Sequence, residues 1–383
     1  MNTMIFRFPS TMLILSFFLL SACSDDGNML VDSADPVDSL IDTLVTSRGI
    51  QFVRTPEENF QDLPDWPYAY QYVEIDELRQ AYAEAGPADG EVVLLIHGQP
   101  SWSYLYRYMI PVLADSGYRV IAMDHLGMGR SDKPVDIFDY SYLGHSDRLE
   151  RFIQQLELSD INLFVQDWGS LIGLRVAGLN PELFATISVG NGALPVIPAG
   201  VFPMTPIQNP NEILEMESPF TSIPEQQEPF YDGCDLLPGA IFDFDAWALY
   251  SMKGASYVAS EVVEALTWYD LSEEVEAAYD APFPSREYMA GTRTFPALVN
   301  EVSGQNEEAW MGLTSYTKPF LTIWGNNDHG SLGTCEAQEI FVENVPGAEG
   351  KPHVRLEEAG HFLQSDQGEE IARRLVDFYS TDW

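Results

Sequence analysis

Asp167 is the first residue of this chain whose type and position predict chemistry. It follows an apolar segment at residues 161–166 and opens the stretch Asp167-Trp168-Gly169-Ser170, after which a helical segment begins. A strand, a sharp turn and a helix in this order make a nucleophile elbow, which exposes the turn residue for attack. A carboxylate can attack a saturated carbon and leave an alkyl ester for water to hydrolyse. The alternative is an aspartate that only caps the following helix, and on this motif alone both interpretations stand.

Two later residues favour the catalytic interpretation. Asp328 lies in the turn GNNDHG behind a predicted strand at residues 319–324, and His361 lies in the segment EAGHF. The chain order of nucleophile, acid and histidine is that of α/β hydrolases. Beside an aspartate nucleophile, we expect His361 to deprotonate the hydrolytic water and Asp328 to orient its ring. Alone, an aspartate in a turn is usually a turn former and a histidine a structural residue, but the three in this order predict a catalytic triad.

The loop after the predicted strand at residues 91–96 is expected beside this elbow, and it reads HGQPSW. One of its backbone N–H groups and that of Trp168 can form an oxyanion hole. Gln99 is also placed to offer a side-chain donor toward the leaving group. We interpret His97 as a structural, hydrogen-bonded residue, and Asp124, at the end of another predicted strand, as a structural acceptor of loop N–H groups.

The elements around these residues predict the fold class. Short apolar runs that are rich in β-branched residues alternate with helix-length segments, which is typical of a doubly wound, mostly parallel α/β sheet. The predicted strands are residues 91–96, 118–123, 161–166, 186–190, 319–324 and, more weakly, 353–356, and the predicted helices between or after them are 142–156, 170–179 and 369–379.

This alternation stops between residues 196 and 308, which we predict to be a helical cap over the carboxyl edge of the sheet. A proline-rich run opens the segment, and candidate helices follow at residues 245–252, 259–266 and 272–278, the last with Ser272 as its N-cap. Ligands bind at the carboxyl edge of open α/β sheets. The core is therefore expected in two parts, residues 49–195 and 309–383.

The first residues are predicted to be a targeting signal. Residues 1–22 hold one charged side chain and an apolar run too short to span a bilayer, which is typical of a signal peptide. The run ends in Leu-Ser-Ala before Cys23, a lipobox-like pattern in which Cys23 is lipidated; a simple signal peptide or a buried helix is the alternative. Residues 23–48 are expected to be an acidic flexible tether. We therefore expect an exported bacterial lipoprotein on the periplasmic side of a membrane or at the cell surface.

Two further cysteines remain, Cys234 and Cys335. In an exported, oxidised protein such a pair often forms a disulfide, and we favour this pairing over two separate buried thiols.

The composition excludes several classes of function. The chain of 383 residues has 45% hydrophobic residues, enough for a large core, and 59 acidic against 19 basic residues give a formal net charge of -40. Such a surface repels phosphate backbones, so we expect no nucleic-acid partner, and no membrane contact beyond the lipid on Cys23. We expect no metal and no cofactor. The oligomeric state is not predictable.

The chain resembles the haloalkane dehalogenases in four core segments: HGQPSWSYLYRYMIPVLADSGYRVIAMDHLGMGRSDKP, VQDWGSLIGL, GNNDHG and AGHFLQ. The similarity extends over roughly residues 51–380, including the cap, and is closest to the subfamily whose catalytic acid follows the late strand, as Asp328 does. The resemblance implies an α/β-hydrolase fold and a reaction in which Asp167 displaces halide from a small halogenated alkane. Water, activated by His361, then releases the alcohol.

The resemblance also assigns residues that spacing alone does not. Trp168 beside the nucleophile and Trp247 in the cap match the two indoles that hold the halide, and Phe244 matches a cavity-wall residue. The related subfamily often has Glu where this chain has Gln99, and the loop after Asp328 departs from the family pattern. An epoxide hydrolase, with the same nucleophile and two proton-donating cap tyrosines, and a non-catalytic lipoprotein of this fold are the alternatives.

Overall fold

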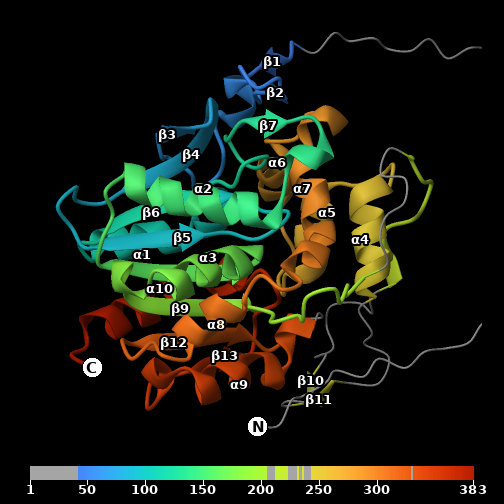
Figure 1. The fold of residues 1–383 in the computed structure, drawn as a ribbon. Helices are drawn as coiled ribbons and strands as arrows, with labels where there is room; N and C mark the ends of the chain where they lie inside the picture. The colour runs from blue at the N-terminus through green and yellow to red at the C-terminus, as the bar shows by residue number, and fades with distance from the viewer. Residues whose placement is uncertain (1–41, 205–211, 223–230, 233–234, 237–242, 329–330) are drawn as a thin grey trace, which may run out of the picture. The chain divides into compact units, whose positions relative to one another are not determined.

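An eight-stranded sheet runs through the protein (Figure 1). The computed structural model describes residues 42–204, 212–222, 231–232, 235–236, 243–328 and 331–383. The strand order is β13-β12-β9-β8-β5-β6-β4-β3, and the strands from β13 to β6 pair in parallel. Their bounds are β3 (Tyr70–Ile75), β4 (Leu78–Ala85), β5 (Val92–Ile96), β6 (Arg119–Met123), β8 (Ile161–Asp167), β9 (Phe184–Gly192), β12 (Phe320–Gly325) and β13 (Val354–Leu356). The predicted doubly wound, mostly parallel sheet is confirmed.

Helices cover both faces of this sheet because its central strands are apolar on both sides. Leu94 and Ile96 of β5 belong to one core with α2, α3 and α8, whereas Val93 and Leu95 belong to a second core with α1 and α10. Successive side chains of a strand point to opposite faces, so a fully apolar strand needs a cover on each. The helix bounds are α1 (Met109–Asp115), α2 (Tyr142–Gln155), α3 (Trp168–Leu179), α8 (Glu307–Leu313), α9 (Cys335–Asn344) and α10 (Leu363–Ser380).

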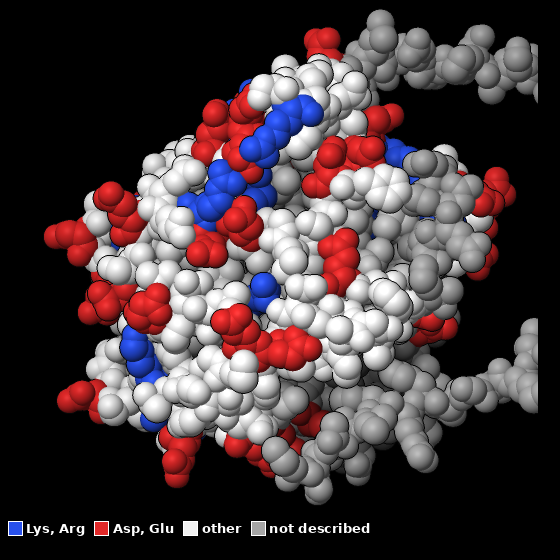
Figure 2. All heavy atoms as spheres, viewed as in Figure 1, with Lys and Arg blue, Asp and Glu red and all other residues white. Residues whose placement is uncertain are grey.

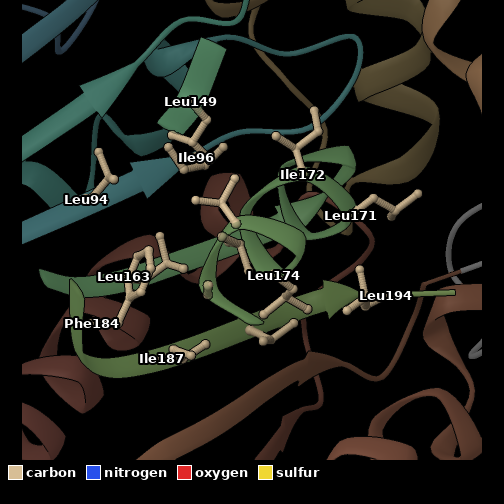
Figure 3. Close-up of a cluster of buried hydrophobic side chains, with 14 of the residues drawn as sticks. Leu94, Ile96, Leu149, Leu163, Leu171, Ile172, Leu174, Phe184, Ile187 and Leu194 are labelled. Atoms are coloured by element: carbon tan, nitrogen blue, oxygen red, sulfur yellow. The ribbon is translucent and has the colours of Figure 1, made fainter. Parts of the chain in front are cut away.

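The first core surrounds α3, the helix that follows Asp167 (Figure 3). Leu163 of β8, Ile187 of β9 and Ile172 and Leu174 of α3 pack together there and are fully buried. Burying one such side chain stabilises a fold by roughly 1.5–3 kcal/mol. The turn at Asp167 is therefore held between two well-packed elements.

The hairpin of β3 and β4 has no counterpart in the sequence prediction. β4 reads LRQAYAEA, which is rich in good helix formers, yet it pairs antiparallel with both β3 and β6. Its tight turn has Asp76 and Glu77 at φ 52° and 64°, as a two-residue hairpin turn requires. Pairing across the sheet outweighs the helix propensity of this segment.

Strand structure is present within the last residues of the predicted tether. β1 (Leu44–Val45) pairs with β2 (Gln51–Val53), which pairs with β7 (Lys133–Pro134), so the structured chain includes residues that were assigned to the tether. The backbone N–H of Thr46 donates to the carbonyl of Ile50 at 3.0 Å and closes the turn between β1 and β2. The predicted signal peptide, Cys23 and the tether up to residue 41 lie outside the described residues. None of the helices in the described part of the chain is long and apolar enough to cross a bilayer.

Residues 196–308, which we call the cap segment, contribute helices between β9 and β12 (Figure 1). These are α4 (Phe244–Lys253), α5 (Ala259–Leu266), α6 (Glu273–Asp280) and α7 (Ala290–Thr294), and the start of α8; β10 (Tyr231–Asp232) and β11 (Asp235–Leu236) form a separate pair. Ser272 accepts a hydrogen bond from the Val275 N–H and caps α6 as predicted. Short 3-10 turns are η1 (Glu57–Phe60), η2 (Ser103–Tyr106), η3 (Ile137–Asp139), η4 (Pro181–Leu183), η5 (Pro219–Ser222), η6 (Arg286–Tyr288), η7 (Phe295–Val302), η8 (Ser331–Gly333) and η9 (Pro346–Ala348).

The surface carries the charge excess of the sequence. Figure 2 shows acidic side chains spread over the visible face and fewer basic ones among them. Some basic side chains lie in ion pairs, such as Arg151 with Asp76 at 2.7 Å and Arg119 with Glu84 at 2.5 Å. Acidic side chains therefore outnumber basic ones on this face, as they do in the sequence.

Candidate active site

Asp167 occupies a strained turn between β8 and α3. Its backbone has φ 49° and ψ −130°, a region that residues other than glycine rarely adopt and that is common at functional sites. Two glycines allow the surrounding chain to approach: a Cβ on Gly98 would lie 2.3 Å from Asp167 Oδ1, and one on Gly169 would lie 2.2 Å from the carbonyl of Ile96. This strand, strained turn and helix have the geometry that a nucleophile elbow requires.

The two carboxylate oxygens of Asp167 have different environments. The backbone N–H of Gln99 donates to Oδ1 at 2.8 Å, whereas Oδ2 faces His361 Nε2 at 3.4 Å. The hydrogen bonds of the described residues include none from the Trp168 N–H, the second predicted oxyanion donor, to this carboxylate. One oxygen is thus held by a backbone N–H, and the other faces the histidine.

The structure brings the three predicted triad residues together. His361 Nδ1 lies 2.8 Å from Oδ2 of Asp328, whose side chain is 1% exposed. A carboxylate accepts this hydrogen bond, so the Nδ1 hydrogen points to Asp328 and Nε2 points to Asp167. Burial lowers the pKa of His361, but the charges of Asp328 and Asp167 and the hydrogen bonds to both outweigh it and raise that pKa to about 10.

The loop that carries His361 is fixed by residues that the sequence did not reveal. Asn191, at the end of β9, donates to the carbonyls of Gly360 at 2.9 Å and His361 at 3.2 Å, and it accepts the Gly325 N–H at 2.8 Å. The N–H of His361 donates to the carbonyl of Leu266 in the cap segment at 2.8 Å. Nothing near Asn191 in the sequence signals this role, because its partners are more than 130 positions away.

Asp366 is a second residue that sequence reasoning missed. Its carboxylate accepts the backbone N–H groups of Gly360 at 2.8 Å, Trp268 at 2.9 Å and Tyr269 at 3.1 Å. Burial raises the pKa of Asp366 to about 6, although these hydrogen bonds oppose the shift. The residue therefore ties the cap segment to the backbone beside His361.

His97 and Asp124 have the structural roles that were predicted. The N–H of His125 donates to His97 Nε2 at 3.0 Å, and burial is the largest cause that holds the pKa of His97 well below its usual value. Asp124 is fully buried and accepts the N–H groups of Ser103 at 2.8 Å and Arg130 at 2.9 Å. Both residues order the loops around the elbow.

The side chain of Gln99 differs from its prediction. Its Nε2 donates to the hydroxyl of Tyr257 at 3.1 Å and to the carbonyl of Thr292 at 3.0 Å. An amide nitrogen has two hydrogens, and both have acceptors in the cap segment, so neither is free for a leaving group. The side chain therefore joins the loop to the cap segment, while the backbone N–H of Gln99 donates to Asp167. The Gln99–Pro100 peptide bond is cis.

Both indoles assigned by resemblance lie near this region, and each is nearly buried. Trp168 is 5% exposed and packs edge-on against Phe295 at 5.4 Å between ring centroids. Trp247 is 6% exposed and stacks on Tyr257 at 6.1 Å, the tyrosine that accepts from Gln99. Phe244, the first residue of α4, packs against the same aromatic cluster.

Cys335 begins α9 and is disulfide-bonded. Its predicted partner, Cys234, lies outside the described residues, so the pairing itself stays a prediction. In the part of the chain that the structure describes, no group of three histidine, cysteine or carboxylate residues could hold a metal ion.

Comparisons with known proteins agree with this geometry. Residues 91–206 match the family model of the alpha/beta hydrolase fold. The chain is 39% identical to a haloalkane dehalogenase of Mycobacterium marinum, and the alignment covers 85% of this chain and 98% of the relative. It is 37% identical to a haloalkane dehalogenase of Psychrobacter cryohalolentis, with 86% of this chain and 98% of the relative covered. A solved tetrameric haloalkane dehalogenase of Paraglaciecola agarilytica superposes with a TM-score of 0.68 at 28% identity, covering 87% of this chain and all of that one.

The sequence identity to these relatives and the fold of the chain indicate the same family. An α/β-hydrolase core, an aspartate at the elbow and identities of 37–39% over nearly the whole of each relative leave one family. The chain belongs to the haloalkane dehalogenases, and its reaction is hydrolytic dehalogenation.

Proposed function

We propose that Asp167 displaces halide from a haloalkane and that His361 activates the water which hydrolyses the resulting alkyl-aspartyl ester. The observation that carries this assignment is the asymmetric carboxylate of Asp167, with Oδ1 held by the Gln99 N–H and Oδ2 facing His361. Oδ2 attacks carbon, halide leaves, and the ester forms. Water then attacks the carboxyl carbon, and negative charge develops on Oδ1, where the Gln99 N–H already donates.

The pKa of His361 supports this order of steps. In the free enzyme the charge of Asp167 contributes to raising that pKa to about 10, so the imidazolium is the dominant form at neutral pH. Ester formation removes the charge of Asp167, and its contribution is lost with it. The pKa of His361 therefore falls once the ester has formed, and the ring becomes a base when water must be deprotonated.

We propose that the indole N–H groups of Trp168 and Trp247 hold the departing halide. An indole N–H only donates hydrogen bonds, which suits a halide anion. It is too weak an acid to protonate the alkoxide that an epoxide would give. Trp168 begins α3 beside the nucleophile. Trp247 stacks on Tyr257, Tyr257 accepts a hydrogen bond from the Gln99 side chain, and the backbone N–H of Gln99 donates to Asp167.

The cap tyrosines support dehalogenation over epoxide opening. Tyr250 donates to the carbonyl of Ser256 at 3.0 Å, and Tyr269 donates to Glu358 at 2.6 Å. The hydroxyl of Tyr257 is bound to Gln99 and lies 3.3 Å from Thr292 Oγ1. Tyr279 of α6 accepts from Arg107 at 2.9 Å and donates to Ser365 Oγ at 3.3 Å. Tyr250 and Tyr269 thus donate their hydroxyl protons within the protein, whereas an epoxide hydrolase needs two cap tyrosines that donate to the substrate oxygen.

The test is halide release from bromoalkanes of increasing length, run beside styrene oxide. We expect steady bromide release from the wild type, no diol above background, and neither product from Asp167→Ala. Diol formation without bromide release would keep the aspartate nucleophile but contradict the proposed substrate class.

We also propose that the mature protein is an exported bacterial lipoprotein with lipid on Cys23, which the Leu-Ser-Ala-Cys pattern behind an apolar run supports. Palmitate labelling in cells should mark the wild type and Cys234→Ala but not Cys23→Ala. Equal labelling of Cys23→Ala would contradict the lipid anchor.

A further inference from the structure

Gln166, the residue before the nucleophile, places its side chain against the imidazole of His361. It is fully buried, and its Nε2 lies 3.1 Å from His361 Nε2 and 3.1 Å from the His361 carbonyl oxygen. A carbonyl only accepts, so the atom that faces it is the amide nitrogen, and the orientation of the amide is fixed. The other amide atom, Oε1, is buried without a hydrogen-bond partner among the described residues.

The turn at the end of β8 makes this contact possible. In a regular strand Gln166 and Asp167 would point to opposite faces. The pairing of β8 with β9 shifts register between these two residues, and Asp167 has φ 49°. Two neighbours in sequence therefore contact the same ring nitrogen.

The groups around His361 favour opposite protonation states. Asp328 at Nδ1 and Asp167 at Nε2 are carboxylates and favour the imidazolium. The amide nitrogen of Gln166 can donate to Nε2 only when that atom has a free lone pair, so it favours the neutral ring. The other contacts of this loop, Asn191 on β9 and the carboxylate of Asp366 on α10, engage backbone atoms of Gly360 and His361.

We propose that Gln166 is a positioning residue that hydrogen-bonds neutral His361 and so controls when this ring acts as the base in ester hydrolysis. The inference rests on the proposed function, because it concerns the second half-reaction. After Asp167 is alkylated, only Asp328 retains a charge at the ring, and the hydrogen bond from Gln166 then favours the neutral state. Water reaches Nε2 by replacing this hydrogen bond, while the second amide hydrogen stays on the His361 carbonyl and keeps the loop in place.

The two half-reactions should respond differently to loss of this donor. One net hydrogen bond corresponds to about half to one pKa unit, so its loss raises the pKa of His361 by that amount. On the acid side of the pH profile, ester hydrolysis then slows about three- to tenfold. Alkylation uses Asp167 Oδ2 and needs no neutral histidine, so its rate should change less than twofold.

Gln166→Met tests the proposal, because methionine keeps the length of the side chain and removes both donors. Rapid quench with 1-bromobutane measures bromide release, intact mass measures decay of the butyl-enzyme across pH 5–9, and histidine NMR titrates His361 directly. Gln166→Glu keeps the shape and adds an acceptor at Nε2, so it should raise the pKa of His361 further. Gln338→Met is the matched control, because Gln338 is also buried and donates through Nε2 to Thr322 Oγ1 and to the Val354 carbonyl.

The expected result is a hydrolysis profile displaced to higher pH in both Gln166 variants, an unchanged burst, and a wild-type profile in Gln338→Met. Equal slowing of both half-reactions at every pH, or a His361 titration that is the same in all proteins, would overturn the proposal. If wild type releases no bromide, the proposed function fails, and the NMR titration alone still decides whether Gln166 sets the protonation of His361.

Discussion

The backbone N–H of His361 donates to the carbonyl of Leu266 at 2.8 Å, so the triad histidine is hydrogen-bonded to the last residue of cap helix α5. The two chains are in close contact there, since a Cβ on Gly360 would lie 2.4 Å from the same carbonyl oxygen. A direct hydrogen bond and a close backbone contact therefore join the cap segment to the loop that carries His361.

Asp366 should be the residue on which this connection depends most. Its carboxylate accepts N–H groups from Gly360, Trp268 and Tyr269. In Asp366→Asn the new amide group faces N–H donors, so a buried donor loses its acceptor. We expect the free energy of unfolding to fall by about 1–3 kcal/mol and ester hydrolysis to slow more than alkylation, as measured by urea unfolding and single turnover.

Glu369→Gln on the same helix is the control for Asp366→Asn. Its side chain is 63% exposed and pairs with Arg373 at 3.2 Å, and such surface pairs contribute about 0–1 kcal/mol. An equal loss of unfolding free energy in both variants would contradict the role of Asp366 in holding the cap segment to the backbone beside His361.

The halide-binding role of Trp247 predicts a defect confined to the first half-reaction. Trp247→Phe keeps the aromatic packing with Tyr257 and Phe220 but removes the N–H donor. Loss of one donor to a developing anion costs about a hundredfold or more in rate, so the bromide burst should slow by that factor while the butyl adduct still forms on Asp167. Stopped-flow halide release measures the burst.

Trp310→Phe is the matched control for Trp247→Phe, because Trp310 lies on α8 and packs against Phe341 in the core. Its burst should match that of the wild type. A wild-type burst in Trp247→Phe would remove this residue from the halide site.

Three buried histidines predict sensitivity to acid. His97 and His125 lie 4.7 Å apart between ring centroids, and His125 and His145 lie 5.7 Å apart. Burial lowers the pKa of His125 to about 4 and those of the other two well below their usual value. The unfolded chain binds protons below pH 6.5 that the folded chain does not, so stability contributed by these groups is lost as pH falls from 6.5 toward 4.

His145→Phe isolates one of these groups. The new ring can keep the contact with Phe295, which lies 4.5 Å from His145. Between pH 7 and pH 5 the variant should lose about 2 kcal/mol less unfolding free energy than the wild type. The variant is compared with the wild type because other groups also change stability with pH. The pKa values of Asp124 and Asp366 are raised to about 6, so these two residues stabilise the fold as pH falls, in both proteins alike. If the unfolding free energies of the variant and the wild type change equally with pH, folding does not lower the pKa of His145.

The disulfide of Cys335 predicts a specific peptide. If Cys234 is the partner, non-reducing digestion should give one cross-linked fragment that contains both, and Cys234→Ser and Cys335→Ser should lower stability equally, by about 3–5 kcal/mol. A fragment that joins Cys335 to Cys23 instead would contradict both the pairing and the lipid anchor.

The sequence predicted those parts of the fold and site that depend on local pattern. The continuous apolar run of β8 and the turn at Asp167 could be predicted without a structure, because each depends on a pattern of consecutive residues. The β4 strand could not, since its three alanines and its glutamate favour a helix and it is pairing with β3 and β6 that makes it extended.

The residues that position the triad were not predictable for a similar reason. Gln166 and Asp366 are ordinary polar residues in the sequence, and each has a partner far along the chain, His361 for Gln166 and Trp268 for Asp366, at 195 and 98 positions. The side chain of Gln99 was assigned to the leaving group because its loop lies beside the elbow, whereas its two hydrogens meet acceptors on the cap segment, which sequence spacing does not place.

Single turnover of His361→Gln with 1-bromobutane tests the assignment of the two half-reactions most directly. Alkylation needs Asp167, whereas hydrolysis of the ester needs His361, held by Asp328 at 2.8 Å. The variant should release about one equivalent of bromide per enzyme and then stop, because the burst marks a trapped covalent intermediate. Its mass should increase by one butyl group, which digestion should place on Asp167. Steady turnover by this variant, or a butyl group on any other residue, would contradict the mechanism.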